Sequence, residues 1–488
     1  MKNIQNFSIF TVVLILLTVL VCFNGKVFAF GNTDSALSDI SITGNQDAAF
    51  FNGILRITTG GKYILSGEHT GQIIVQAARN DVVELVLNNL ILHNPDGPAI
   101  YAPRSQRVEL ILPDGTINTI SDGRHLNDEN NAAIYVQHDL IISGNGMLHI
   151  AGNYRHGIRV HDTLTIDSGV ITVRAVGDAL RGRDGVIIED GTFTLNAGGD
   201  GIQSNRESNP EQGYITINGG TFIIAAEDDG IQAEGAITIN NGSISIKAKD
   251  DGITSSGSVL ITGGDIHIID SYEGIEGHSV TITGGNINIF ARDDGINARN
   301  GGAVTTGRAV IAGRAAIHSP ARENIYVRIT GGNINVRALR DGIDSNNNFF
   351  LEGGTLHISG PSRGREGAID VDGSVYITGG ELITAGSVIN ISAQSTQPVL
   401  LFTYSQQLPI GTLIEVKDKK SATLLNYTAE IAFSMSGFTS PNFVLGDTYS
   451  LNINGEKMEE LTLNSIITNI GDGSLRSGRD GTGSIRRR

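Results

Sequence analysis

Short runs in which apolar and polar residues alternate recur along most of the chain. Residues 280–283 read VTIT and residues 286–289 read NINI, with two glycines between them. Alternation with a period of two predicts short β-strands that are buried on one face. A pair of strands this short cannot bury a face by itself, so we expect the strands to pack against copies of themselves.

Self-comparison shows a repeat of about 22 residues. The segments AAEDDGIQAEGAITINNGSISI, KAKDDGITSSGSVLITGGDIHI and IDSYEGIEGHSVTITGGNINI follow one another directly. Each has an acid, a glycine, an isoleucine that we call the anchor, a few polar residues, an alternating strand, a Gly-rich turn and a second strand. The anchors are Ile100, Ile134, Ile158, Leu180, Ile202, Ile231, Ile253, Ile275, Ile296, Ile317, Ile343 and Ile369. Ile317 divides a long step, which makes about twelve coils.

The repeat favours one of three folds that have this periodicity. Leucine-rich repeats need an L-x-x-L-x-L-x-x-N pattern, and the calcium-loaded nonapeptide roll needs GGxGxD every nine residues. These strands are instead rich in Ile, Val and Thr, with Gly-Gly turns. Stacked in parallel at about 4.8 Å, they would enclose a column of apolar side chains. We therefore predict an all-β protein, a single-stranded right-handed parallel β-helix.

Four segments are expected along the chain. Residues 1–29 are predicted to be a signal peptide, 30–390 the β-helix, 391–470 a small C-terminal β module that caps one end, and 471–488 a disordered basic tail rich in Gly and Ser. The composition suits many tight turns, since there are 63 glycines and only 10 prolines in 488 residues.

The N-terminal segment predicts export. Lys2 precedes an apolar run over residues 9–23, and small residues at Val27 and Ala29 favour cleavage after Ala29. A retained N-terminal anchor is the alternative. Cleavage would remove the single cysteine, Cys22, and change the formal net charge from −16 to −18. We expect a secreted or cell-surface protein whose mature chain has no integral membrane span and no nucleic-acid partner.

Acidic residues recur two positions before the anchor in six consecutive coils, from Asp178 to Asp294. A second partial column lies one position earlier. In the coil of Ile317 the position holds Ala315, which interrupts the column. The candidate metal ligands are Asp178, Asp200, Asp228, Asp229, Asp250, Asp251, Glu273, Asp293, Asp294 and Asp341.

Stacked carboxylates need a counter-charge. Like charges about 5 Å apart repel by about 3 kcal/mol at an effective dielectric near 20. Calcium takes six to eight oxygen ligands in flexible geometry, and the scarcity of His and Cys disfavours zinc. The alternative is that each Asp caps its own Asp-Gly turn. We expect calcium as the cofactor.

Cationic and aromatic residues beside the acids are candidates for sugar contact. They are Lys249, Tyr272, Arg292, Arg314 and Arg340. Solvated charges on an outer face are the alternative interpretation of the four cations. Surplus residues in long coil steps, such as 204–213, predict loops that rim one side of the acid column, and loops on a rigid scaffold often carry binding residues.

A series of motifs then points to a family. GPAIYAP, LPDGTINTISDG, GGDGI, DDGI, DGIDSN and GAIDVDGSVYITGGEL follow in order, and over about residues 35–455 the chain resembles the bacterial carbohydrate-binding domain-containing family of secreted right-handed β-helices. The resemblance implies a fold similar to that of pectate lyases, calcium, and binding to cell-wall polysaccharides, including acidic pectin-like ones. It supports the acids of the DGI motifs as calcium ligands.

Three classes of function follow from these features. The favoured one is a non-catalytic, calcium-dependent protein that binds plant-cell-wall or acidic polysaccharide. The second is a calcium-dependent pectate-type lyase, in which Lys249 would take the proton. The third is a structural surface protein or adhesin in which the coils are a rigid spacer. No catalytic residue is assigned under the first interpretation.

Overall fold

The structure, a computed structural model, describes residues 41–44, 48–123, 130–207, 209, 211–300, 324–362 and 366–471. All of them belong to the unit Leu37–Arg488. The predicted signal peptide, the basic tail, Arg314 and Ile317 lie outside the described residues. Within the described part of the chain, every named element is a strand, and no helix there is suited to crossing a membrane.

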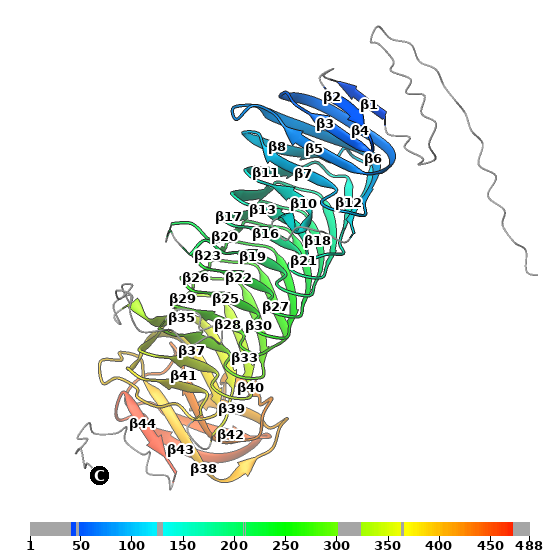
Figure 1. Cartoon of the computed structure of the whole chain (residues 1–488). Coiled ribbons are helices and arrows are strands. Elements are labelled where there is room, and N and C mark those ends of the chain that lie inside the picture. Colours follow the sequence, from blue (N-terminus) through cyan, green and yellow to red (C-terminus); the bar gives the residue numbers. More distant parts are fainter. Residues whose placement is uncertain are drawn as a thin grey trace, which may run out of the picture. The chain divides into compact units, whose positions relative to one another are not determined.

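Each central coil contributes three strands. In one coil these are β22 (Ile231–Ala233), β23 (Ile237–Ile239) and β24 (Ser243–Ala248), and in the next they are β25 (Ile253–Ser255), β26 (Ser258–Ile261) and β27 (Asp265–Ser271). Corresponding strands pair in parallel, with Ile231 opposite Ile253 and Ile237 opposite Val259. The anchor thus lies on a strand of its own, a third strand that the sequence template did not include (Figure 1).

The strands form three parallel stacks. The anchor stack adds β3 (Ile54–Ile57), β5 (Gln72–Gln76), β7 (Ile100–Arg104), β10 (Ala132–Val136), β13 (His156–Val160), β16 (Leu180–Gly182), β19 (Ile202–Ser204), β28 (Ile275–Gly277), β31 (Ile296–Ala298), β34 (Ile343–Ser345) and β36 (Ile369–Val371). At its N-terminal end β2 (Ala48–Phe51) pairs antiparallel with β3. The second stack adds β8 (Arg107–Ile111), β11 (Asp139–Ser143), β14 (Thr163–Ile166), β17 (Gly185–Ile188), β20 (Tyr214–Ile217), β29 (Ser279–Ile282) and β32 (Tyr326–Ile329). The third stack adds β9 (Ile117–Asp122), β12 (Met147–Gly152), β15 (Val170–Ala175), β18 (Thr192–Ala197), β21 (Thr221–Ala226), β30 (Asn286–Ala291) and β33 (Asn333–Ala338).

Long strands close the two ends of the stacks. β4 (Gly61–Thr70), β6 (Val82–Asn94), β35 (Asn348–Ser359) and β37 (Val375–Ala385) run across the second and third stacks, and β1 (Ser41–Gly44) pairs antiparallel with β4. The remaining strands are β38 (Val399–Leu408), β39 (Leu413–Asp418), β40 (Thr423–Thr428), β41 (Phe433–Thr439), β42 (Thr448–Ile453), β43 (Glu456–Thr462) and β44 (Ile467–Ile470). Strands β39, β40, β42 and β43 make an antiparallel sheet over a second apolar cluster, to which β37, β38 and β41 also contribute, and β41 pairs antiparallel with β37.

The core is the column of inward-facing Ile, Val and Leu side chains that the repeat predicted. The anchors Ile231, Ile253 and Ile275 are fully buried, and the rings of Phe193 and Phe222 stack at 4.5 Å in adjacent coils. Alternate residues point outward, as the period of two requires. The all-β, parallel β-helix-like architecture is therefore confirmed, while the handedness of the winding stays a prediction.

The prediction of a separate coil at Ile317 is wrong. Ile296 lies directly opposite Ile343 in the anchor stack, and β29 pairs with β32 as β30 pairs with β33. Strands β31 and β32 therefore follow one another directly in the stacks, and residues 301–323 between them lie outside the described residues. The spacing alone was compatible with a coil, but the segment has neither the acid nor the strand pattern that a coil needs. Two further coils precede Ile100, with Leu55 opposite Ile73 and Ile73 opposite Ile100.

Candidate functional site

The acids lie at the turn that leads from a third-stack strand into the next anchor strand. β24 ends at Ala248, Asp250 and Asp251 form the turn, and β25 begins at Ile253. The neighbouring Gly252 allows close stacking, because a Cβ there would lie 2.6 Å from the carbonyl oxygen of Gly274. This turn recurs in successive coils, so the backbone itself brings the acids into a row.

One oxygen of most of these carboxylates bonds the backbone of the following coil. Asp229 Oδ1 accepts from the N–H of Asp251 at 2.9 Å, and Asp251 Oδ1 accepts from the N–H of Glu273 at 3.1 Å. In the same way, Asp200 Oδ1 accepts from the N–H of Asp229, and Asp294 Oδ1 accepts from the N–H of Asp341. The acids therefore cap the neighbouring coil and not their own turn, which differs from the alternative stated above.

Five overlapping groups of three carboxylates follow, each with oxygens within 4.8 Å of one another. We call them together the carboxylate ladder. The groups are Asp200, Asp228 and Asp229; Asp229, Asp250 and Asp251; Asp251, Glu273 and Glu276; Glu273, Asp293 and Asp294; and Asp294, Asp341 and Glu366. Neighbouring groups share a residue, and the row continues from Asp294 to Asp341 because no coil separates them. The sequence predicted that Ala315 would interrupt the acid column, but the pairing of Ile296 with Ile343 makes the coils of Asp294 and Asp341 direct neighbours.

Burial and mutual repulsion disfavour the ionised form of these groups. Burial, followed by the charges of Asp251 and Asp200, raises the pKa of Asp229 to about 9. Burial, followed by the charge of Asp178, raises the pKa of Asp200 to about 7. Burial, followed by the charge of Glu276, raises the pKa of Asp251 to about 7. The pKa of Glu273 is raised too, chiefly by burial and by the adjacent Glu276. The ladder is thus an unfavourable place for several negative charges unless a cation lies among them.

At the N-terminal end of the acid column, the carboxylate is paired with basic side chains of the protein. Asp178 Oδ2 lies 2.9 Å from Arg181 Nη1 and 3.1 Å from His156 Nδ1. Hydrogen bonding and charge from His156, with the charge of Arg181, hold the pKa of Asp178 below its usual value despite burial. Among the described residues Asp178 belongs to none of the five groups, so we leave it out of the proposed cation sites.

The C-terminal end also meets an arginine. Arg340 bridges Asp293 at 3.1 Å and Glu366 at 2.8 Å, and these two bonds raise its pKa. Arg340 was a candidate for sugar contact, and the structure places it instead against members of two carboxylate groups. It therefore supplies part of the counter-charge there.

The other sugar-contact candidates lie close to the ladder. Lys249 is exposed and forms an ion pair with Glu227 of the preceding coil. Arg292 Nε lies 3.2 Å from Asp270, and its Nη2 donates to the carbonyl oxygen of Lys249 at 2.5 Å. Tyr272 is exposed, and a hydrogen bond to Asp293 raises the pKa of its hydroxyl. All three border the solvent side of the turns.

Two ladder residues were missed by the sequence assignment. Glu276 lies one residue after an anchor, is buried, and pairs with Arg299 while accepting from Thr254 Oγ1 at 3.1 Å. Glu366 lies three residues before an anchor, in register with Arg340 and Asp293. The repeat alignment contained a signal for both, because each occupies a position that is polar in neighbouring coils.

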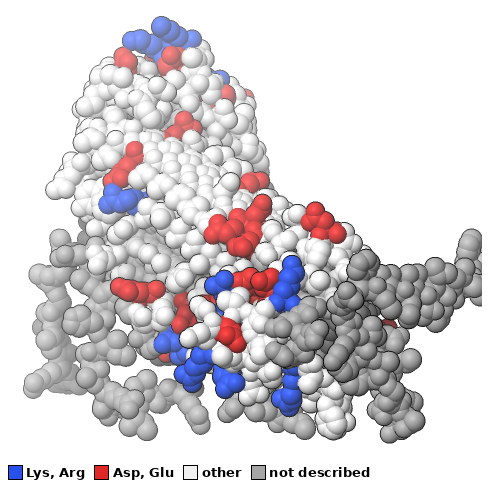
Figure 2. Space-filling model, turned by 90° about the horizontal axis from the view of Figure 1, so that it is seen from above, with Lys and Arg blue, Asp and Glu red and all other residues white. Residues whose placement is uncertain are grey.

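The donor set fits a hard cation such as calcium. Each group offers carboxylate oxygens, the ligands that calcium prefers. The second oxygens of Asp229 and Asp251 have no hydrogen-bond donor within the described part of the chain. Asp228 and Asp250 are exposed, so the groups open to solvent on one side. Figure 2 shows a face on which acidic side chains gather in compact groups with Lys and Arg beside several of them.

A separate groove of about 410 Å³ lies beside the third stack, and Glu430, which lies between β40 and β41, also lines it. His267, Asn288 and Arg337 line it, and the Arg337 guanidinium lies 4.7 Å from the centre of the Phe290 ring. No residue of the ladder lines this groove. It is a second polar surface on a different face of the coils.

Comparison with known proteins gives three matches. A family model described as carbohydrate-binding domain-containing protein matches residues 52–315 and 250–399. A carbohydrate-binding domain-containing protein of Acetivibrio thermocellus is 34% identical over 128 residues, which are 25% of this chain and 45% of the relative, so the match spans less than half of that relative. A solved structure of the polysaccharide lyase-like protein from C. thermocellum, in a gadolinium derivative, aligns with a TM-score of 0.44 at 31% identity, over 44% of this chain and 90% of that chain.

Proposed function

Since the chain belongs to the carbohydrate-binding domain-containing protein family, we propose that it binds an acidic polysaccharide outside the cell through calcium held by the carboxylate ladder. Carbohydrate binding follows from the family. The metal, the class of glycan and the location are our additions. The metal and the glycan rest on the carboxylate ladder, and the location rests on the predicted signal peptide.

The observation behind the proposal is the set of overlapping carboxylate groups with raised pKa values. Asp229 belongs to two groups, and its pKa of about 9 reflects burial next to Asp251 and Asp200. Folding positions these acids at a cost that a bound divalent cation would remove, since an opposite charge within a few ångströms favours the ionised form. Bound calcium would supply positive charge and open coordination positions at the surface of an acidic protein.

The carboxylates of one group differ in their exposure to solvent, and so in their expected role. The buried Asp251 and the half-buried Glu273 would hold the cation from the protein side, while the exposed Asp228 and Asp250 mark where the groups meet solvent. A calcium ion takes six to eight oxygens, more than three carboxylates supply unless all are bidentate. The remaining positions are then available to water or to oxygens of a glycan.

An acidic glycan suits this arrangement better than a neutral one. The chain has a formal net charge of −16, so a polymer with carboxylates would be repelled unless cations lay between the two. Calcium shared between ladder and polymer would convert that repulsion into binding. We therefore expect polyuronates of the pectin type to be bound most tightly.

The first prediction is calcium-dependent binding to polygalacturonate. In a pull-down or calorimetric titration with the protein lacking residues 1–29, calcium should strengthen binding at least about tenfold over EDTA, while a neutral glucan should bind equally in both buffers. Equal binding of polygalacturonate with and without calcium would refute the metal bridge.

The same samples test the lyase alternative. A lyase would release unsaturated uronates, which absorb in the ultraviolet, from polygalacturonate with calcium present. We expect no increase in absorbance. A steady increase that disappears in Lys249→Gln would replace the non-catalytic function with the lyase.

A further inference from the structure

The groove of about 410 Å³ beside the third stack, which we call the third-stack groove, carries polar side chains that the carboxylate ladder does not use. Its volume lies within the range of small-molecule sites, about 300–1,000 Å³. Parallel register places His267 opposite Asn288 and Asn288 opposite Asn335, so these three residues form one outward row of the groove. Phe290 and Arg337 pair in a second row beside it. Imidazole, amide, aromatic and guanidinium groups thus line one surface.

The two asparagines bond each other and leave a donor and an acceptor unused. Asn335 Nδ2 donates to Asn288 Oδ1 at 3.1 Å. Within the described part of the chain neither side chain has a further hydrogen bond, so Asn288 Nδ2 and Asn335 Oδ1 have no protein partner there. Each sugar hydroxyl can donate and accept, and a neighbouring amide donor and amide acceptor match a pair of adjacent hydroxyls.

Arg337 is held by ring packing and not by an acid. Its guanidinium lies 4.7 Å from the centre of the Phe290 ring, and its buried Nε has no hydrogen-bond partner. Among the described residues no carboxylate forms an ion pair with it. The Nη donors of Arg337 are therefore available to an oxygen atom in the groove.

The C-terminal strands cover one end of the groove. The Ser359 hydroxyl contacts the Tyr427 hydroxyl at 2.8 Å and accepts from the N–H of Glu430 at 2.9 Å. Ser359 lies opposite Arg337 in the next strand, β35, and the ring of the neighbouring outward residue His357 packs against the Tyr427 ring at 5.1 Å. These contacts place Glu430 at the groove and close the outward rows at this end.

The strand at the other end of the groove is irregular. β27 contributes His267 and Ile268 to the lining, and its pairing shifts register against both β24 and β30. The preceding pairs β15 with β18, β18 with β21 and β21 with β24 have no such shift, and neither has β30 with β33. Bulges change the direction of side chains and are frequent beside functional sites. The irregularity of the third stack therefore coincides with the groove.

The charges of the groove favour a neutral ligand. Arg337 and Glu430 both line it, and no ion pair joins them within the described residues. Burial raises the pKa of Tyr427 to about 12, and the nearby charges of Glu430 and Arg337 act on it in opposite directions. An acidic sugar would be attracted by Arg337 and repelled by Glu430. A neutral sugar can accept from the guanidinium and donate to the carboxylate, and both are charge-assisted hydrogen bonds.

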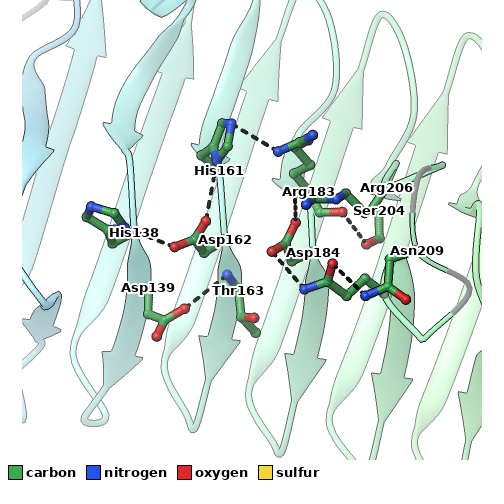
Figure 3. A network of polar contacts seen from close by, with 11 residues as sticks. His138, Asp139, His161, Asp162, Thr163, Arg183, Asp184, Ser204, Arg206 and Asn209 are labelled. Carbon is green, nitrogen blue, oxygen red and sulfur yellow. Dashed lines mark hydrogen bonds and ion pairs between the residues drawn. The ribbon is translucent and has the colours of Figure 1, made fainter.

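Other arginines of the coils are engaged with neighbouring side chains, as in the polar network of Figure 3. There Arg206 Nη1 donates to Asp184 Oδ1 at 2.9 Å, and Arg183 Nη1 lies 3.1 Å from His161 Nε2. The network thus satisfies its own donors and acceptors. Arg337 differs from these arginines because its only contact of this kind is with a ring.

We propose that the third-stack groove binds the terminal residues of a neutral glycan without a metal ion. Asn288, Asn335, Arg337 and Glu430 would bond the sugar hydroxyls, and Phe290 provides apolar surface. A chain end is favoured over an internal stretch because the C-terminal strands cover one end of the groove. This inference goes beyond the proposed function, since it needs neither calcium nor an acidic polymer.

The test uses neutral oligosaccharides of defined length. Binding of di-, tri- and hexasaccharides of glucose, xylose, mannose and galactose is measured by calorimetry in EDTA and in calcium. The groove variant Arg337→Gln/Glu430→Gln removes both charges and keeps the net charge. Arg174→Gln/Glu459→Gln does the same at exposed positions of β15 and β43 that do not line the groove, and is the matched control.

We expect at least one series to bind the wild type and the control equally in both buffers, and to bind the groove variant about tenfold more weakly. Its trisaccharide should bind about as tightly as its hexasaccharide, because only the chain end is held. The inference is overturned when no series binds the wild type, when the groove variant binds like the control, when binding requires calcium, or when affinity keeps rising from tri- to hexasaccharide.

Calcium-dependent binding of polygalacturonate, measured on the same samples, tests the proposed function separately. Its loss with neutral binding intact removes only the proposed function, and its persistence without neutral binding removes only this inference. Unchanged melting shows that the groove variant is folded. Otherwise Glu430→Gln, at an exposed position, replaces it with Glu459→Gln as the control and the same criteria.

Discussion

At the scale of single residues, Asp229 shows how one side chain can have two separable roles. One oxygen accepts the N–H of Asp251 at 2.9 Å, which is a structural role in joining coils. The carboxylate also belongs to two groups of the ladder and has a pKa of about 9 because of burial and its acidic neighbours. Asparagine keeps the acceptor oxygen and removes the charge, whereas alanine removes both.

Substitution at Asp229 should therefore separate the two roles. In EDTA at neutral pH, Asp229→Asn should melt within a few degrees of the wild type, while Asp229→Ala should lose about 1–3 kcal/mol because the Asp251 N–H is left without its acceptor. Calcium should raise the Tm of the wild type and have a smaller effect on both variants. Asp167→Asn, at an exposed position outside the ladder, is the control. A full calcium response in Asp229→Asn would exclude Asp229 as a ligand.

At the scale of elements, close stacking of the turns depends on the glycine that precedes the anchor. Gly201, Gly230, Gly252, Gly274, Gly295 and Gly342 hold this position in the six consecutive coils of the ladder, and Ala179 and Ala368 flank them. A Cβ at Gly252 would lie 2.6 Å from a carbonyl oxygen and 2.9 Å from Ile268. The Gly-Gly turns need glycine for a different reason: Gly264 has a φ of 94°, a backbone conformation that residues with a side chain rarely adopt.

Gly252→Ala should widen the spacing of adjacent turns and destabilise the protein by about 1–3 kcal/mol, the usual cost of overpacking. Because the acids on either side would move apart, the calcium-induced rise in Tm should shrink as well. Thermal melts with and without calcium measure both effects. Gly97→Ala is the matched control, since its Cβ would meet nothing closer than 3.4 Å. Equal melting of the two variants would contradict the packing argument.

At the scale of the whole molecule, the ladder couples stability to pH and to calcium. A carboxyl group whose pKa is raised on folding binds its proton more tightly in the folded state. Its contribution to stability is complete below about pH 4 and is lost as the pH rises through the folded value. For Asp200 and Asp251 that value is about 7, and for Asp229 about 9. The depressed pKa of Asp178 acts in the opposite direction, at lower pH.

The Tm of the protein in EDTA should therefore fall as the pH is raised from 5 to 9. Calcium competes with protons for the same oxygens, so its stabilising effect should grow over that range and flatten the curve. Differential scanning calorimetry at several pH values, with EDTA or calcium, measures this. A Tm in EDTA that is constant or rises between pH 5 and 9 would contradict the raised pKa values.

Much of this architecture is readable from the sequence because a repeat imposes its own geometry. Alternating Val280 and Ile282 must share a face, and residues one period apart must stack, so the core column and the acid column followed from local pattern alone. The same reasoning failed where spacing was ambiguous, since the step from Ile296 to Ile343 has the length of two coils and yet these two anchors pair directly with each other.

The sequence by itself determined the class of fold, the row of acids and the expectation of a cation, because these depend on what repeats every 22 residues. Tertiary structure decided which carboxylates share a group, that Asp178 belongs to Arg181 and His156, and that Glu276 and Glu366 join the ladder. These facts depend on distances between side chains in different coils, and such distances are set by stacking register and burial, which no single segment of the sequence contains.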